Sequence, residues 1–265
     1  DEVVSFAAAL GRSPRYSIDS FLANRDDFRL VGTACISIAI SHFEDTYRQN
    51  LARLEFKRDW YQLLYNRLGA SRKDIEKSCL NIITFNYDRS LEAYLEAAFM
   101  VDFSTSREEA RDAMKAIKIV HIYGANGPQA LGDKPSDFGP SESDILIMPE
   151  ARSDQENVLE AQEIIRTSRL ICFLGFGYDP ENVTRLNAFN SWPEGSKQHL
   201  YGMPPPPQKR SFGTTMGKTP AELKDIASHF KIPFDKNKGG PEMDCLELIR
   251  HTGVLNDLTV PINRH

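Results

Sequence analysis

The pattern of hydrophobic and polar positions changes near residue 78. Up to that point apolar side chains recur at helical spacing, as in 54–68, where they return every three or four positions. From residue 79 on, short apolar runs rich in β-branched residues alternate with helical stretches. Strands that alternate with helices are typical of a parallel sheet. We therefore expect an α/β fold, with a helical N-terminal annex in 1–78 and a doubly wound, Rossmann-like parallel sheet in 79–265.

Boundaries of the expected elements follow from the same pattern and from helix-start signals. Strands are expected at 80–85, 117–123, 144–148, 169–174 and 198–201. Helices are expected at 17–22, 31–48, 54–68, 88–99, 107–116, 153–167 and 241–251, with a further helix that starts at Thr219-Pro220. Ser153 and Glu156 form a capping box for their helix. The proline run 204–207 predicts an extended segment, and 213–217 predicts a loop.

Polar or glycine-rich segments stand at the end of, or directly after, the three clearest expected strands, which are otherwise almost wholly apolar. These segments are Asn86-Tyr87-Asp88, His121-Ile122-Tyr123-Gly124 with Ala125-Asn126-Gly127, and Gly175-Phe176-Gly177. In an open parallel sheet, ligands bind beyond the carboxyl ends of the strands. We therefore expect a ligand site that draws on all three segments.

Each of these segments also has a purely structural interpretation. Asp88 is placed to be the N-cap of the next helix, and Asp179, followed by Pro180, is an N-cap signal as well. Gly175 and Gly177 would permit a tight turn between strand and helix. The same turn also lets a ribose or phosphate approach the backbone at a helix start, so both interpretations stay open.

Composition and charge exclude several classes of function. The net charge of −5 argues against a nucleic-acid surface, so we expect nucleic acid only indirectly, through a partner. No apolar run approaches the roughly 20 residues of a membrane-spanning helix. The four cysteines show no C-x-x-C spacing, which predicts no zinc ribbon and no metal site. They indicate a reducing, cytoplasmic compartment.

Four segments resemble the sirtuin-like superfamily, and in particular its bacterial branch. Residues 82–92 resemble the block T-F-N-Y-D-x-x-L-E, and 119–124 resemble the strand that ends in His-Gly in most members. Residues 172–180 resemble the block G-F-S/G-x-x-D-P, and 17–22 are similar to S-I-D-x-F-L. The resemblance spans about residues 17–202, and we expect one sirtuin-like domain over residues 1–265.

The resemblance implies an NAD site, with NAD as the substrate. Asn86 matches the asparagine that orients the nicotinamide ribose or a water, and His121 or Tyr123 would contact the ribose hydroxyls and take a proton. The other expected binding residues are Thr84, Phe85, Asp88, Gly124, Gly175, Phe176 and Gly177. Many bacterial members degrade NAD in antiphage defence, together with a sensor partner or a second domain. We therefore expect hydrolysis of NAD to nicotinamide and ADP-ribose, in a homo-oligomer or in a hetero-complex with a sensor protein or domain.

Two departures from the family pattern leave alternatives open. The family's first strand and G-A-G-x-S loop are not found in 1–16, so either they precede residue 1 or this member lacks them. Tyr123-Gly124 stands where most members have His-Gly, and His121 would share a strand face with Tyr123. The alternative to hydrolysis is a non-catalytic sensor or scaffold that binds NAD or ADP-ribose. A third possibility is a structural module of a larger defence assembly that binds no ligand. The absent zinc ligands disfavour a deacetylase.

Overall fold

The chain forms two compact units, each a mixture of helices and a parallel pair of strands. The computed structural model describes residues 2–15, 17–52, 59–69, 71–126, 155–186, 210–230, 243–256 and 258. The first unit consists of 1–57 and 80–157, and the second of 58–79 and 158–265. The α/β class is therefore confirmed for the described residues, whereas the expected single domain over 1–265 stays a prediction.

Helices in the first part of the first unit pack through a small aromatic core. The helices are α1 (Glu2–Gly11), α2 (Ile18–Leu22), the short 3-10 helix η1 (Asp26–Phe28) and α3 (Arg29–Ala52). Phe6, Phe21 and Leu22 form the core together with Ile36 of α3. A Cβ atom added to Gly32 would lie 2.4 Å from Cδ2 of Leu22, so only glycine permits this close approach of α2 to α3.

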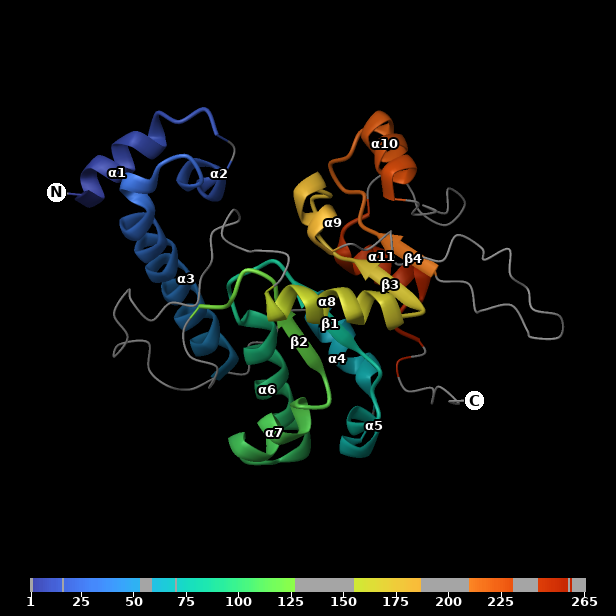
Figure 1. Cartoon of the computed structure of the whole chain (residues 1–265). Helices are drawn as coiled ribbons and strands as arrows, with labels where there is room; N and C mark the ends of the chain where they lie inside the picture. Colours follow the sequence, from blue (N-terminus) through green and yellow to red (C-terminus); the bar gives the residue numbers. More distant parts are fainter. Residues whose placement is uncertain are drawn as a thin grey trace. The chain divides into compact units, whose positions relative to one another are not determined.

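The rest of the first unit is a strand–helix–helix–strand segment. It comprises β1 (Asn81–Thr84), α6 (Ser90–Phe103), α7 (Arg107–Met114) and β2 (Lys118–His121). Figure 1 shows β1 and β2 side by side, and they are parallel, with Asn81 opposite Lys118 and Thr84 opposite His121. The four expectations for this segment are thus confirmed, although β2 ends at residue 121 instead of continuing to 123.

The second unit has its own parallel pair. Its elements are α4 (Trp60–Leu68), α5 (Arg72–Glu76), α8 (Glu156–Thr167, whose first two residues belong to the first unit), β3 (Leu170–Phe173), α9 (Pro180–Leu186), β4 (Arg210–Gly213), α10 (Pro220–Phe230) and α11 (Cys245–Thr252). In the pairing of β3 with β4, Leu170 lies opposite Arg210 and Phe173 opposite Gly213. Phe173, Val183 of α9 and Ile226 of α10 share one core.

Two expectations for the second unit were wrong. The strand that pairs with β3 is Arg210–Gly213, where the sequence predicted no strand, because a four-residue run with an arginine and a glycine carries no apolar pattern. The last helix begins at Cys245, not at residue 241, because the Asp244 side chain accepts a hydrogen bond from the backbone N–H of Glu247 and so caps the helix there. Its end at Gly253, with a φ of 60°, is as expected.

Other expected features lie outside the described residues: the strands at 144–148 and 198–201, the capping residue Ser153 and the proline run 204–207. Within the described part of the chain, the structure contains two parallel two-stranded sheets and no larger one. No described helix has both the length and the apolar character needed to cross a membrane.

Candidate functional site

The carboxyl ends of β1 and β2 bring the first two expected site segments together in the first unit. Thr84 and His121 are register partners at the last position of their strands. The backbone N–H of Ile122 donates to the Thr84 carbonyl at 2.9 Å, which holds the two chains together one position further. The segments that begin at Phe85 and Ile122 therefore leave the sheet from the same edge, as expected for neighbouring parallel strands.

Asn86 combines a restrained backbone with an exposed side chain. Its backbone N–H donates to Oγ1 of Thr84 at 3.1 Å, and its carbonyl faces Nδ1 of His121 at 2.9 Å. Asn86 is exposed, and its amide makes no hydrogen bond to any described residue. An amide offers two donors and one acceptor oxygen, so this strand end presents an exposed polar group on a residue whose backbone is held on both sides.

Both ring nitrogens of His121 face hydrogen-bond acceptors. Nδ1 lies 2.9 Å from the Asn86 carbonyl and Nε2 lies 2.9 Å from Oε1 of Glu92. The side chains of His121 and Glu92 are only 10% and 9% exposed. An imidazole donates from both nitrogens only when it carries both protons. A ring that makes both of these bonds has no nitrogen lone pair left to accept a proton. In this arrangement His121 does not act as the expected base.

Tyr123 is not arranged as the sequence predicted. Because β2 ends at His121, Tyr123 lies in the following turn, and the strand alternation that would place it on the same face as His121 does not apply. Tyr123 is only 4% exposed. Its ring packs against Phe85, at 5.7 Å between centroids, and lies 6.4 Å from the ring of Tyr87. Gly124 follows with a φ of 75°, a left-handed conformation that favours glycine.

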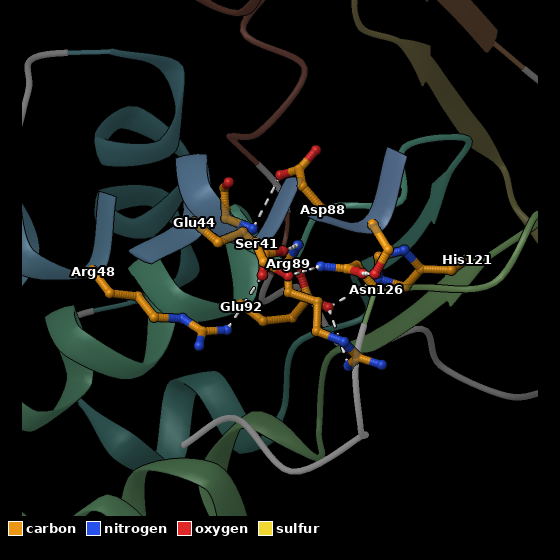
Figure 2. Close-up of polar contacts among 10 residues, drawn as sticks. Ser41, Glu44, Arg48, Asp88, Arg89, Glu92, His121 and Asn126 are labelled. Carbon is orange, nitrogen blue, oxygen red and sulfur yellow. Dashed lines mark hydrogen bonds and ion pairs between the residues drawn. The ribbon is translucent and has the colours of Figure 1, made fainter. Parts of the chain in front are cut away.

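A buried carboxylate of α3 holds the segment that follows Asn86. Oε1 of Glu44 accepts a hydrogen bond of 2.6 Å from the backbone N–H of Arg89, and Oε2 lies 3.6 Å from the Arg48 guanidinium. Figure 2 shows Glu44 and Arg48 of α3 beside Arg89 and Glu92. Burial raises the pKa of Glu44 above its ordinary value, and the nearby Asp88 carboxylate adds to that effect, while the Arg89 and Arg48 contacts oppose it.

Asp88 is not the N-cap that the sequence predicted. Helix α6 begins at Ser90, so its N-cap is Arg89, whose side chain makes no capping bond. Oδ1 of Asp88 accepts instead from the backbone N–H of Ser90 at 3.1 Å. Asp88 thus stabilises the turn that leads into α6 from one position further upstream.

The N-terminal helices hold both strand-end segments through side chains that the sequence did not single out. Oδ1 of Asp19 accepts a hydrogen bond of 2.9 Å from the Tyr87 hydroxyl. Asn126 accepts from the Ser37 hydroxyl at 2.6 Å and donates to Oγ of Ser41 at 2.9 Å. The backbone N–H of Asn126 also donates to the Tyr87 carbonyl at 2.7 Å. The first of these bonds connects the S-I-D-x-F-L and T-F-N-Y-D segments, and the others connect Asn126 to α3 and to Tyr87.

The third expected segment, Gly175–Gly177, belongs to the second unit. Gly175 has a φ of +63°, and its N–H donates to Oγ1 of Thr214 at 2.9 Å. Gly177 has no heavy atom within 4 Å of an added Cβ, and its φ lies outside the left-handed range, so the local structure does not require glycine there. Tyr178 follows with a φ of 57°, an uncommon conformation for a residue with a side chain. Asp179 caps α9, as predicted, by accepting from the N–H groups of Glu181 and Asn182.

Two observations on the described residues concern thiols and metal ligands. Burial, with a smaller effect of the Cys245 thiol, raises the pKa of Cys172 to about 12, so this thiol stays protonated at neutral pH. No group of three or more His, Cys, Asp or Glu side chains in the described part of the chain could hold a metal ion.

The sequence overlooked Glu92 and Glu44 as members of this site. One available signal was the pair Glu92 and Glu96, which stand four residues apart in a helix that is otherwise apolar on all sides and buried. Buried carboxylates require partners, so this pair indicated a polar contact of α6. Glu44 lies in the long helix α3 among exposed residues, and no sequence signal distinguished it.

Comparison with known proteins adds no neighbour: no family model, no curated protein and no solved structure matches this chain.

Proposed function

We propose that this chain is a sirtuin-like domain that binds NAD and hydrolyses it to nicotinamide and ADP-ribose. The observation that carries the proposal is the exposed side-chain amide of Asn86 on a residue whose backbone is held at both its N–H and its carbonyl. It lies at the carboxyl end of a parallel strand, where α/β folds bind ligands. The resemblance of 82–92 to the family block supports the same residue.

The chemistry needs few groups from the protein. The bond between nicotinamide and ribose breaks with its electron pair on the nicotinamide nitrogen, and the ribose passes through an oxocarbenium-like state. A water adds to the anomeric carbon and gives up one proton. In this proposal Asn86 orients either a ribose hydroxyl or that water, and Thr84, Phe85, Asp88 and Gly124 surround the ribose.

The wider fold is also part of the proposal. Two parallel strand pairs, each with a helix in its connection, are the building blocks of a doubly wound Rossmann-like sheet. Gly175, Phe176 and Gly177 follow β3 of the second unit and are proposed to bind a ribose or phosphate group there. The open space beside Gly177 supports this, because a ligand can approach its backbone.

The biological setting rests on the resemblance alone. We propose an effector of antiphage defence in the cytoplasm that acts as a homo-oligomer or with a sensor partner. Nucleic acid would act only through that partner.

The test is nicotinamide release from NAD by the full-length protein, alone and with extract of phage-infected bacteria. We expect Asn86→Ala to lower release at least about 100-fold, since it removes the group that orients the reacting atoms. Asn66→Ala is the matched control, because Asn66 is also an exposed asparagine but lies on α4 of the second unit. Undiminished release by Asn86→Ala would refute the assignment.

A second function is favoured by the surroundings of the two expected bases. Both nitrogens of His121 are occupied by acceptors, and Tyr123 is buried against aromatic rings. A module that binds NAD or ADP-ribose without turnover needs neither base. It predicts that either ligand raises the melting temperature while no nicotinamide is released under any activating condition.

A further inference from the structure

We infer that Glu92 is a positioning residue of the proposed NAD site and acts on Asn86 through His121. The inference rests on the proposed function, since it assigns a role in that site to a side chain that does not itself reach a ligand. It follows from the contacts and the burial around His121.

Glu92, His121 and Asn86 form a chain of two hydrogen bonds. Glu92 accepts from Nε2 of the ring at 2.9 Å, and Nδ1 of the ring lies 2.9 Å from the Asn86 carbonyl. Glu92 belongs to α6, His121 ends β2 and Asn86 follows β1, so the chain links three elements of the first unit. Side-chain exposures of 10% for His121 and 9% for Glu92 mean that water competes poorly for the bond between these two side chains.

The two partners of the ring are both oxygen acceptors. Each contact is therefore a hydrogen bond only when its ring nitrogen carries a proton. Figure 2 shows His121, Glu92 and Arg89 among the labelled residues. The Arg89 guanidinium lies 3.8 Å from Glu92, further than the ring, so the ring is the nearer partner of this carboxylate.

The two bonds give Glu92 an effect on the exposed amide. With the His121 bond, the backbone of Asn86 is held at its carbonyl as well as at its N–H, that is, on both sides of its Cα atom. Without this bond, the carbonyl loses its donor and the peptide plane between Asn86 and Tyr87 turns more freely. The Cα atom, and with it the side-chain amide, is then held less firmly. A displacement of about 1 Å at a reacting group can cost about 100-fold in rate. Glu92 therefore contributes to the site by keeping the amide in place.

Glu96 is the matched control for Glu92. Both belong to α6, both are 7% exposed when the whole residue is counted, and both form ion pairs. Glu96, however, binds Arg107 at 2.9 Å and Arg111 at 2.8 Å, at the side of α7. If buried carboxylates of α6 had only a structural role, substitution of either glutamate would affect activity equally. If Glu92 positions Asn86, only substitution of Glu92 lowers activity.

The experiment compares Glu92→Gln, Glu96→Gln, His121→Ala and the double variant Glu92→Gln/His121→Ala in the full-length protein. Glutamine retains the shape of glutamate but not its charge. We expect Glu92→Gln to lower kcat/KM for NAD about 10- to 100-fold, mainly in kcat, and Glu96→Gln to change it less than about twofold. The double variant should be no worse than His121→Ala alone, since Glu92 acts through the ring.

A second measurement does not depend on hydrolysis. In protein labelled with ¹⁵N-histidine, the two ring nitrogens of His121 are assigned by their disappearance in His121→Ala. We expect both to carry protons in the wild type and in Glu96→Gln, and one to lose its proton in Glu92→Gln at the same pH.

The outcomes separate the inference from the proposed function. Activity unaffected by Glu92→Gln, or lowered equally by Glu96→Gln, overturns the inference and leaves the hydrolase intact. A ring that is singly protonated in the wild type also overturns it. If neither the wild type nor any variant turns over NAD, the proposed hydrolase activity is refuted. The ¹⁵N signals of the His121 ring then test by themselves whether Glu92 holds the ring against the Asn86 carbonyl.

Discussion

The hydrogen bond between Tyr87 and Asp19 gives a direct test of how the N-terminal helices hold the strand-end segment. Tyr87→Phe removes only the hydroxyl that donates to Oδ1 of Asp19 at 2.9 Å. A hydrogen bond to a charged group contributes about 1.5–3 kcal/mol. Both residues are half-buried, so the lower end, about 1.5 kcal/mol, applies. At about 2–4 °C per kcal/mol, the melting temperature should fall by about 3–6 °C.

The assay is thermal unfolding followed by circular dichroism and calorimetry, combined with a double-mutant cycle. The cycle uses Tyr87→Phe, Asp19→Ala and the double variant, and we expect a coupling energy of about 1–1.5 kcal/mol. Tyr178→Phe is the comparison within the second unit, because the Tyr178 hydroxyl donates to the neutral Thr214 carbonyl at 3.3 Å. That longer, neutral bond should be worth about 0.5–1 kcal/mol.

The reasoning fails if the cycle shows no coupling between Tyr87 and Asp19. It fails also if Tyr87→Phe costs no more than Tyr178→Phe, because the carboxylate would then add nothing to a neutral acceptor. In either case, the S-I-D-x-F-L segment would not be held to the strand end by this bond.

Two further predictions concern backbone conformation and pH. Gly175→Ala should lower the free energy of unfolding, measured in urea, by about 1–2 kcal/mol, because Gly175 has a φ of +63°. Gly177→Ala should change it by less than about 0.5 kcal/mol, because the φ of Gly177 lies outside the left-handed range. Equal effects of the two substitutions would contradict this prediction. The pKa of Glu44 is higher in the folded protein than the value of 4.5 expected in the unfolded chain. Its protonated form therefore stabilises the fold at a pH below 4.5, and this contribution is lost as the pH rises through the folded-state pKa. The free energy of unfolding of the wild type minus that of Glu44→Gln should therefore fall from pH 4.5 to neutrality, and a rising or flat difference would refute the burial argument.

Much of the local structure was predictable because its signals are local. Strands β1, β2 and β3 are runs of apolar residues bounded by polar ones, and the caps Ser17 and Asp179 act on N–H groups within three residues. β4 was not predictable in this way. Its sequence Arg-Ser-Phe-Gly has little strand character, and it is a strand because β3 supplies the parallel partner for its backbone.

The site shows the same division. Asn86 was chosen as a candidate because it follows an apolar strand and lies in a segment that resembles a family block. His121 was chosen because strand alternation would place it on the same face as Tyr123. The partners of His121 were not identified, because Glu92 is 29 residues away and the Asn86 carbonyl belongs to another segment. Tyr123 was misplaced because the strand was extended by two residues beyond its observed end, and period-two reasoning has no meaning in a turn.

The sequence by itself determined the class of the fold, the order of its main elements and the strand-end positions where polar groups gather. These follow from hydrophobic periodicity and capping, which act over a few residues. The tertiary structure alone decided which groups meet there: Asp19 with Tyr87, Glu44 with the N–H of Arg89, and His121 between Asn86 and Glu92. The physical reason is that hydrogen bonds and charge pairs depend on distance in space, and only the packing of α3, α6 and the strands brings these distant residues within about 3 Å.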